Sequence, residues 1–377
     1  MKNKDSIFFI GSVFNESIFN CGFQISPASN RWQKGITNGF LNNNINIINI
    51  CSVPDRIFPL GRLCPVVDKS FFNFEKTYLV RYINLPFIRK ISLGLNLFFK
   101  SLYLKKIYGN PIAIITYNPT FENSLCGFLL QKFFKFKWID LCADHYDPKT
   151  NWINYNPLAK KSKAHIFLSY YAFKNAPFKN KYHFEGGIEL KGKKKINDIK
   201  KFTVLYSGMM SEWGGLNTLL EAFMLIKKEH KFELWVCGHG YNKKLEESIK
   251  IDTRIKKFGF VSEKKLIELS NKASIFINPR GKDVNGNKMN FPSKILEYLS
   301  YCKPVISTWT YGLSPEYKKV LNVVDSDNPE DIADEIKKVF QWSNRKINYN
   351  NLIIKKFIKT KSWDIQTKNL IKWIKTN

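Results

Sequence analysis

Short apolar runs alternate with amphipathic, helix-like segments along the whole chain. An apolar run at 6–13 is followed by turn-forming residues, a helical pattern at 32–41 and a second apolar run at 45–50. A strand, loop, helix and strand within about 45 residues are typical of a right-handed crossover unit, from which doubly wound parallel sheets are built. The order of the segments therefore predicts an α/β fold.

The second half of the chain repeats this order. Strand patterns at 202–206, 232–238 and 255–261 alternate with helical patterns, after a polar, lysine-rich segment. Because 377 residues exceed one ordinary hydrophobic core, we predict two doubly wound domains. We expect an N-terminal domain, a linker, a second domain and a C-terminal helix that packs back toward the N-terminal domain, at 1–190, 191–200, 201–355 and 356–377.

The stretch 272–308 has the layout of an anion site. An apolar strand pattern ends at Asn278 and Pro279, and Arg280 follows at its carboxyl end. Pro292 is tolerated only in the first turn of a helix, so we expect the next helix at 291–301. Ser293, Lys294 and Glu297 would share or flank one face of that helix. A diphosphate suits the two cations, and Glu297 can accept hydrogen bonds from sugar hydroxyls.

Two other strand ends carry candidate residues. Gly208, Gly214 and Gly215 follow the strand at 202–206 and would let the backbone approach a phosphate closely. In the first half, Asp144 and His145 follow the strand pattern at 138–141. Ligands of open parallel sheets bind at the carboxyl ends of strands, so these positions are candidates for contact with a ligand.

The chain is strongly basic. Sixty Lys and Arg residues against 31 acidic ones give a net charge of +29, which favours binding of nucleotide sugars, anionic lipid surfaces or nucleic acid. Residues 85–106 combine apolar, aromatic and basic side chains without an acidic one. This segment is either an amphipathic helix on an anionic membrane surface or a helix packed on the sheet with a solvated lysine face.

The cysteine pattern and the hydropathy indicate a compartment. The seven cysteines have no paired spacing, which argues against disulfides and zinc and favours a reducing cytoplasm. No apolar run reaches the roughly 18 to 20 residues that span a bilayer, and the first residues lack a signal-peptide cleavage pattern. We expect a cytoplasmic protein, either soluble or peripherally associated with the inner face of the membrane.

A series of short motifs in the second half resembles the donor-binding domain of glycosyltransferase family 4, whose members are retaining enzymes of the GT-B fold. The motifs keep their order over about 100 residues, and they are Tyr206-Ser-Gly208, Gly214-Gly215, Phe258-Gly-Phe-Val261, Asn278-Pro-Arg280, Phe291-Pro-Ser-Lys294, Glu297-Tyr-Leu299 and Lys303-Pro-Val-Ile306. The first half is similar only in its strand and helix order, Gln33-x-Gly35 and Glu185-Gly-Gly187. The resemblance implies two Rossmann-like domains that face each other across a cleft.

The resemblance also implies roles for individual residues. Glu297 would bind the nucleotide ribose, Arg280 and Lys294 would neutralise the diphosphate, and the backbone near Phe260 and Val261 would hold the base. Asp144 or His145 would contact the donor sugar or the acceptor. The implied donor-binding set is Gly208, Gly214, Gly215, Phe260, Val261, Arg280, Asn290, Ser293, Lys294 and Glu297, and the catalytic set is Asp144, His145, Arg280 and Lys294.

The chain departs from the family pattern at three positions. Met289 stands where the family has a carboxylate, and Met209 and Trp213 or Gly214 stand where it has Arg and Lys. The diphosphate charge would then rest on Arg280, Lys294 and main-chain amides. Recognition of the sugar hydroxyls is left to loop N–H groups or to Asn287 and Asn290.

The expected function is retaining transfer of a sugar from a nucleotide diphosphate donor, by family preference a UDP-sugar, to a glycan or lipid-linked acceptor in cell-surface polysaccharide biosynthesis. We expect no cofactor. No Asp-x-Asp pair is found at a strand end where it could hold a divalent metal beneath the diphosphate, so we expect metal-independent transfer. The alternatives are a basic nucleic-acid-binding protein, an inverting transferase and a sugar-nucleotide epimerase.

Overall fold

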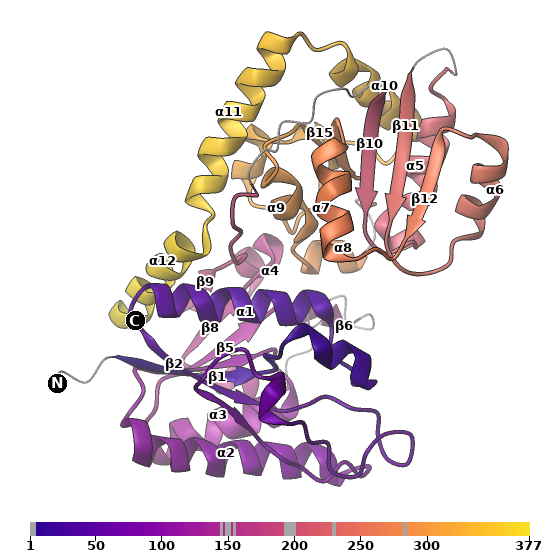
Figure 1. The fold of residues 1–377 in the computed structure, drawn as a ribbon. Helices are drawn as coiled ribbons and strands as arrows, with labels where there is room; N and C mark the ends of the chain where they lie inside the picture. Colours follow the sequence, from indigo (N-terminus) through magenta and orange to yellow (C-terminus); the bar gives the residue numbers. More distant parts are fainter. Residues whose placement is uncertain are drawn as a thin grey trace. The chain divides into compact units, whose positions relative to one another are not determined.

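The computed structural model describes residues 5–143, 146–147, 152–153, 156–191, 201–227, 231–281 and 285–377. Contacts between residues divide the chain into two units, of which unit 1 comprises Met1–Gly187 and Trp363–Asn377, and unit 2 comprises Ile188–Ser362 (Figure 1). The linker expected at 191–200 lies outside the described residues except for Lys191.

Unit 1 is built on a parallel sheet of seven strands in the order β3-β2-β1-β4-β5-β8-β9. The strands are β1 (Ser6–Gly11), β2 (Asn46–Cys51), β3 (Thr77–Leu79), β4 (Ala113–Tyr117), β5 (Trp138–Cys142), β8 (Ala164–Phe167) and β9 (Lys181–His183). Its helices are α1 (Pro27–Asn42), α2 (Ile88–Tyr108), α3 (Phe121–Phe134), α4 (Tyr170–Asn175) and α12 (Trp363–Thr376). Figure 1 shows α1 and α12 on one face of this sheet and α2 and α3 on the other. The short strands β6 (Tyr146–Asp147) and β7 (Trp152–Ile153) pair separately.

Unit 2 has a parallel sheet of six strands in the order β12-β11-β10-β13-β14-β15. The strands are β10 (Phe202–Ser207), β11 (Phe232–Cys237), β12 (Ile255–Gly259), β13 (Ile275–Asn278), β14 (Val305–Thr308) and β15 (Asn322–Val324). The helices are α5 (Leu216–Met224), α6 (Lys243–Ile251), α7 (Glu263–Lys272), α8 (Asn285–Met289), α9 (Lys294–Leu299), α10 (Pro329–Phe340) and α11 (Asn344–Thr360). One core cluster joins Phe223 of α5 and Ile336 of α10 to Val204 and Leu234 of the sheet. The two doubly wound sheets confirm the predicted fold class.

The last helix, α12, packs on α1 of unit 1. A Cβ atom at Gly35 would lie 2.2 Å from the Trp363 ring, and one at Gly39 would lie 2.5 Å from Thr367. Trp32 meets the Trp363 ring edge-on, with ring centroids 5.8 Å apart. The small residues of α1 therefore form a groove that the side chains of α12 fill.

Several predicted elements differ in extent. α1 begins at Pro27 rather than near residue 32, because Ser26 caps its N-terminus and proline fits the first helical position. The helix expected at 291–301 is shorter: α9 ends at Leu299, and the turn that follows contains Cys302 in a left-handed conformation with φ of 51°. The helices α3 and α11 were not expected. The helix predicted at 85–106 is confirmed as α2.

A buried ionisable pair lies between two neighbouring strands of unit 1. Asp140 of β5 and His165 of β8 are in register, with 4.0 Å between Oδ2 and Nδ1. Burial raises the pKa of Asp140 to about 8 and lowers the pKa of His165 to about 4. Both side chains are therefore largely uncharged near neutral pH.

We expect Asp140→Asn to remove a pH dependence of stability between about pH 6.5 and 8. In the unfolded chain Asp titrates near 3.9 and His near 6.5. The stability from protonated Asp140 is complete below about pH 4 and is lost as the pH rises to about 8. The opposite contribution of neutral His165 is complete above about pH 6.5 and is lost as the pH falls to about 4.

Above about pH 6.5 the change in the Asp140 contribution is the larger of the two, so the wild-type free energy of unfolding should fall by about 1 kcal/mol up to pH 8. Urea unfolding at pH 6.5, 7.25 and 8 measures this slope. Asp325→Asn, at an exposed aspartate, is the matched control and should keep the wild-type slope. If the free energy of unfolding of Asp140→Asn changed with pH as it does in the wild type, Asp140 could not be protonated in the folded protein.

Candidate active site

The candidate site lies where the strand order of unit 2 reverses. β10 and β13 are paired neighbours, while β11 lies on the other side of β10 and β14 on the other side of β13. In a doubly wound sheet the chain segments that follow two such strands run to opposite sides. A crevice therefore opens at the carboxyl ends of the two strands. Ser207 ends β10 and Asn278 ends β13, so the predicted glycine turn and Arg280 lie at the same edge.

Three glycines bring the strand ends close together. A Cβ atom at Gly215, which has a φ of +74°, would lie 1.6 Å from the carbonyl oxygen of Pro279. A Cβ at Gly238 would lie 1.6 Å from the carbonyl oxygen of Gly208, and one at Gly214 would lie 2.3 Å from the Tyr206 hydroxyl. A side chain at Gly215 or Gly238 would collide with a backbone carbonyl, so these two glycines allow the strand ends to approach closely.

Arg280 is half-buried at the end of β13. Burial lowers the pKa of its guanidinium, and the nearby hydroxyls of Tyr206 and Tyr298 oppose this shift. A guanidinium nevertheless stays protonated in proteins. Among the described residues no carboxylate lies within ion-pair distance of Arg280, so its charge is available to an anion.

The helix α9 carries Lys294 and Glu297 one turn apart. Lys294 Nζ lies 2.9 Å from Glu297 Oε2 and 3.4 Å from Ser207 Oγ. Tyr298 fixes the helix to the sheet, since its hydroxyl accepts a hydrogen bond from Ser207 N–H at 2.8 Å and donates one to Ser207 O at 2.9 Å. The structure thus brings Lys294 to the glycine turn, which follows Ser207.

Lys191 adds a third cation that the sequence analysis assigned to the linker. Its Nζ atom lies 3.7 Å from Glu297 Oε1, so Glu297 lies between two ammonium groups. Arg280, Lys191, Lys294 and Glu297 together carry a net charge of about +2. A diphosphate of charge about −2 would balance this set.

The other predicted residues occupy different parts of the same edge. Phe260 is exposed directly after β12, and its ring meets that of His239 edge-on at 6.3 Å. Val261 follows it. Ser293 is exposed before α9 and makes no side-chain cap, while the carbonyl oxygen of Asn290 lies close to Gly312.

Met289 and Asn287 are both buried in α8. The Asn287 side chain donates a hydrogen bond to Gly281 O at 2.9 Å, which holds the loop after Arg280. Met289 is thus a packing residue at the position where the resemblance places a carboxylate. Asp144 and His145 lie outside the described residues, so the structure does not place them.

An Asp-x-Asp pair does follow a strand of unit 2. Asp325 and Asp327 come directly after β15, which is the edge strand and is separated from β13 by β14. The described residues contain no group of three or more His, Cys, Asp or Glu side chains arranged to hold a metal ion.

Comparisons with known proteins match the segment that contains these residues. Residues 201–341 match the family model described as "Glycosyl transferases group 1". This segment contains the glycine turn, Arg280, Lys294 and Glu297. No match was found among curated protein sequences.

Solved structures with the same fold cover nearly the whole chain. Sucrose-phosphate synthase from Thermosynechococcus elongatus has a TM-score of 0.68 at 13% identity, with 99% of each chain covered. Anabaena Alr3699/HepE in complex with UDP has a TM-score of 0.70 at 12% identity, over 99% of this chain and 100% of that chain. The lipopolysaccharide outer core galactosyltransferase WaaB has a TM-score of 0.64 at 16% identity, over 98% and 99%.

These likenesses confirm the GT-B fold with two Rossmann-like domains. Together with the family match at 201–341 they support a GT-B glycosyltransferase. In the described part of the chain no helix is both long and apolar enough to span a bilayer.

Proposed function

We propose that this protein is a retaining glycosyltransferase that moves a sugar from a nucleotide diphosphate donor to a glycan or lipid-linked acceptor. The observation that carries the proposal is the net positive cluster of Arg280, Lys191, Lys294 and Glu297 beside the glycine turn, within the group 1 domain. A UDP-sugar is the proposed donor, and Anabaena Alr3699/HepE, which has the same fold, was solved in complex with UDP and with UDP-glucose.

Arg280 and Lys294 would stabilise the charge that develops on the donor. The bond between the anomeric carbon and the β-phosphate oxygen breaks, and its electron pair stays on the leaving diphosphate. The acceptor oxygen attacks the anomeric carbon from the same face and passes its proton to the leaving phosphate oxygen. Cations that are already held in place at this oxygen lower the barrier, since they need no reorganisation as the charge appears.

The remaining groups would position the substrates. Glu297, held by Lys191 and Lys294, would accept hydrogen bonds from the ribose hydroxyls, and Phe260 and Val261 would lie at the base. Asp144 and His145 are proposed to contact the sugar or the acceptor. We further propose transfer without a metal or other cofactor, in the cytoplasm at the inner face of the membrane, during synthesis of a cell-surface polysaccharide.

A donor panel tests this proposal. We expect one of UDP-, GDP-, dTDP- and CMP-sugars to raise the melting temperature by several degrees at saturation, because a ligand that binds only the folded state stabilises it. The shift should persist in EDTA and be smaller in Glu297→Ala, which weakens donor binding. The donor that binds is then assayed for hydrolysis and transfer, and NMR of the product gives the anomer.

The outcomes separate the alternatives. Inversion at the anomeric carbon would contradict the retaining mechanism, and a changed sugar on an intact nucleotide would indicate an epimerase. If no sugar nucleotide shifts the melting temperature while random DNA duplexes bind in a salt-sensitive manner, the transferase proposal fails.

A further inference from the structure

One end of unit 1 carries an unusual concentration of exposed apolar side chains. Thirteen of the 29 large exposed apolar side chains in the described residues lie between residues 57 and 107. On α2 they form a continuous stripe that comprises Ile88, Ile91, Leu95, Phe99, Tyr103 and Ile107. Side chains at this spacing share one face of a helix.

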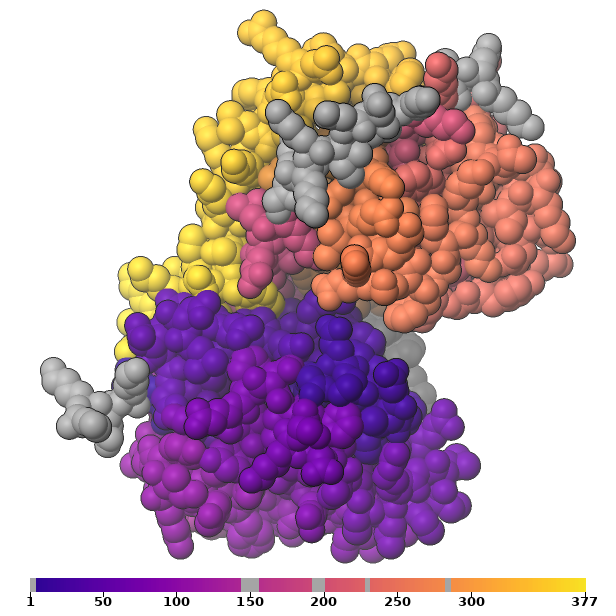
Figure 2. All heavy atoms as spheres, in the orientation of Figure 1, coloured from indigo at the N-terminus to yellow at the C-terminus, as the bar shows by residue number. Residues whose placement is uncertain are grey.

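The opposite face of α2 is the buried one. Leu93, Leu97 and Leu104 are buried, and α2 packs against α3 and the sheet. The helix therefore packs on the rest of unit 1 through a different face, and the exposed stripe has no role in that packing. Figure 1 shows α2 as the outermost layer of unit 1 on this side of the sheet, and Figure 2 shows the same segment at the surface.

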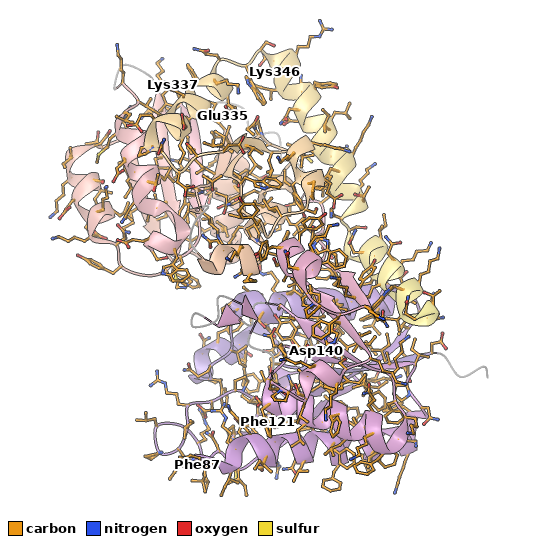
Figure 3. The ribbon with its side chains drawn as sticks, turned by 180° about the vertical axis from the view of Figure 1, so that it is seen from behind. Phe87, Phe121, Asp140, Glu335, Lys337 and Lys346 are labelled. Atoms are coloured by element: carbon orange, nitrogen blue, oxygen red, sulfur yellow. The ribbon has the colours of Figure 1, made fainter. Side chains whose placement is uncertain are left out.

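A loop extends the stripe beyond the start of α2. Phe87, immediately before the helix, is 97% exposed and has a φ of 63°, a backbone region that a bulky side chain rarely adopts. Figure 3 shows Phe87 at the outer edge of unit 1. Leu60 in the preceding loop is 81% exposed.

Hydrogen bonds fix this loop to the segment before α2. The buried Asn84 side chain donates hydrogen bonds to Arg56 O at 2.6 Å and Arg62 O at 2.8 Å, and Asn84 N–H donates one to Leu63 O at 2.8 Å. Asp55 adds an ion pair with Arg62 at 3.0 Å. The loop tip and the helix therefore form one surface, which we call the α2 face and define as residues 57–66 and 87–107.

Basic groups border the α2 face. Lys100 lies over the Tyr103 ring at 5.2 Å, and Lys105 lies over the Phe134 ring at 5.2 Å. The helix α2 contains no acidic residue, and Lys106 lies near its end. An apolar stripe flanked by aromatic rings and lysines is complementary to the acyl chains and anionic headgroups at a bilayer surface.

We propose that the α2 face docks this protein on an anionic lipid bilayer, with Leu60, Phe87 and the stripe of α2 in the headgroup and acyl boundary and the lysines at the lipid phosphates. The inference goes beyond the transfer activity and stands independently of it. The sequence indicated membrane contact through residues 85–106 alone, and the structure adds the loop at 57–66 to this surface.

Sedimentation with lipid vesicles tests the proposal on the full chain. We expect the wild type to bind vesicles of phosphatidylcholine with 30% phosphatidylglycerol and to bind pure phosphatidylcholine about tenfold more weakly in 0.1 M NaCl. The variant Leu60→Ser/Phe87→Ser should lower the partition constant about tenfold, because both side chains are exposed and leave the core intact. Lys100→Glu/Lys105→Glu/Lys106→Glu should also lower the partition constant by about tenfold or more.

Matched controls use unit 2. Ile251→Ser/Tyr349→Ser removes two exposed apolar side chains, and Lys337→Glu/Lys338→Glu/Lys346→Glu makes the same charge change elsewhere (Lys337 and Lys346 are labelled in Figure 3). Both controls should bind within about a factor of two of the wild type. The variant Phe99→Trp places a tryptophan on the α2 face. Vesicles that contain brominated lipids should quench the tryptophan fluorescence of this variant more than that of the wild type.

Three outcomes would overturn the proposal. The first is no binding of the wild type to the anionic vesicles, and the second is an equal loss in the control variants. The third is a wild-type dimer that Leu60→Ser/Phe87→Ser converts to a monomer without vesicle binding, which would make the α2 face an interface between two copies of the chain.

Discussion

Lys294→Ala should lower kcat/KM for the sugar donor about a thousandfold. The lysine is placed at the glycine turn by α9, and its charge would meet the leaving diphosphate where negative charge accumulates. Most of the loss should appear in kcat, since the interaction strengthens as the bond breaks. The free energy of unfolding should change by less than about 1 kcal/mol, because the Lys294–Glu297 pair is partly exposed.

Glu297→Ala should lower kcat/KM about a hundredfold, through weaker donor binding and the loss of the carboxylate that orients Lys294 and Lys191. The chain contains a matched control on α7. Lys265 and Glu268 form a pair with the same spacing and the same 2.9 Å separation, and neither residue belongs to the proposed donor-binding set. Lys265→Ala and Glu268→Ala should leave turnover within about a factor of two of the wild type. Wild-type rates in Lys294→Ala and Glu297→Ala would overturn the proposed site.

Gly215→Ala should destabilise the protein by about 3 kcal/mol or more and also reduce donor turnover strongly. The added methyl group carries the cost of a left-handed backbone and meets the carbonyl oxygen of Pro279. Relief of that contact moves Pro279 and with it Arg280. Urea unfolding and the donor assay measure the two effects.

Gly259→Ala separates these two causes. Gly259 also has a positive φ, of +67°, but a Cβ atom there has no neighbour within 4 Å. This variant should lose only about 1 kcal/mol, the cost of the backbone conformation alone. Equal losses in the two variants would show that the contact with Pro279 has no role.

Local patterns predicted the parts of the site that are close in sequence. Arg280 directly follows a strand, and Lys294 and Glu297 are one helical turn apart, so strand and helix periodicity suffices to place them. The distant contacts could not be predicted in this way. Lys191 reaches Glu297 across a long separation in sequence, and nothing in its lysine-rich surroundings distinguishes it from its neighbours.

Other features were not predicted because they depend on tertiary packing. The helix α3 was not predicted because its apolar side chains do not form a single stripe, and it contacts both α2 and the sheet. Met289 looked like a substitution in a binding motif, and its burial shows a packing role instead. The protonated state of Asp140 depends on complete burial, which a single sequence does not reveal.

The packing of α12 on α1 has a consequence for synthesis on the ribosome. Unit 1 ends at Gly187 and resumes only at Trp363, after the whole of unit 2. At about 5–20 residues per second, roughly 10–35 s separate the emergence of these two parts. During this interval the groove at Gly35 and Gly39 has no Trp363 or Thr367 to fill it. The N-terminal unit of a nascent chain therefore exposes an apolar surface to chaperones until α12 has emerged from the ribosome.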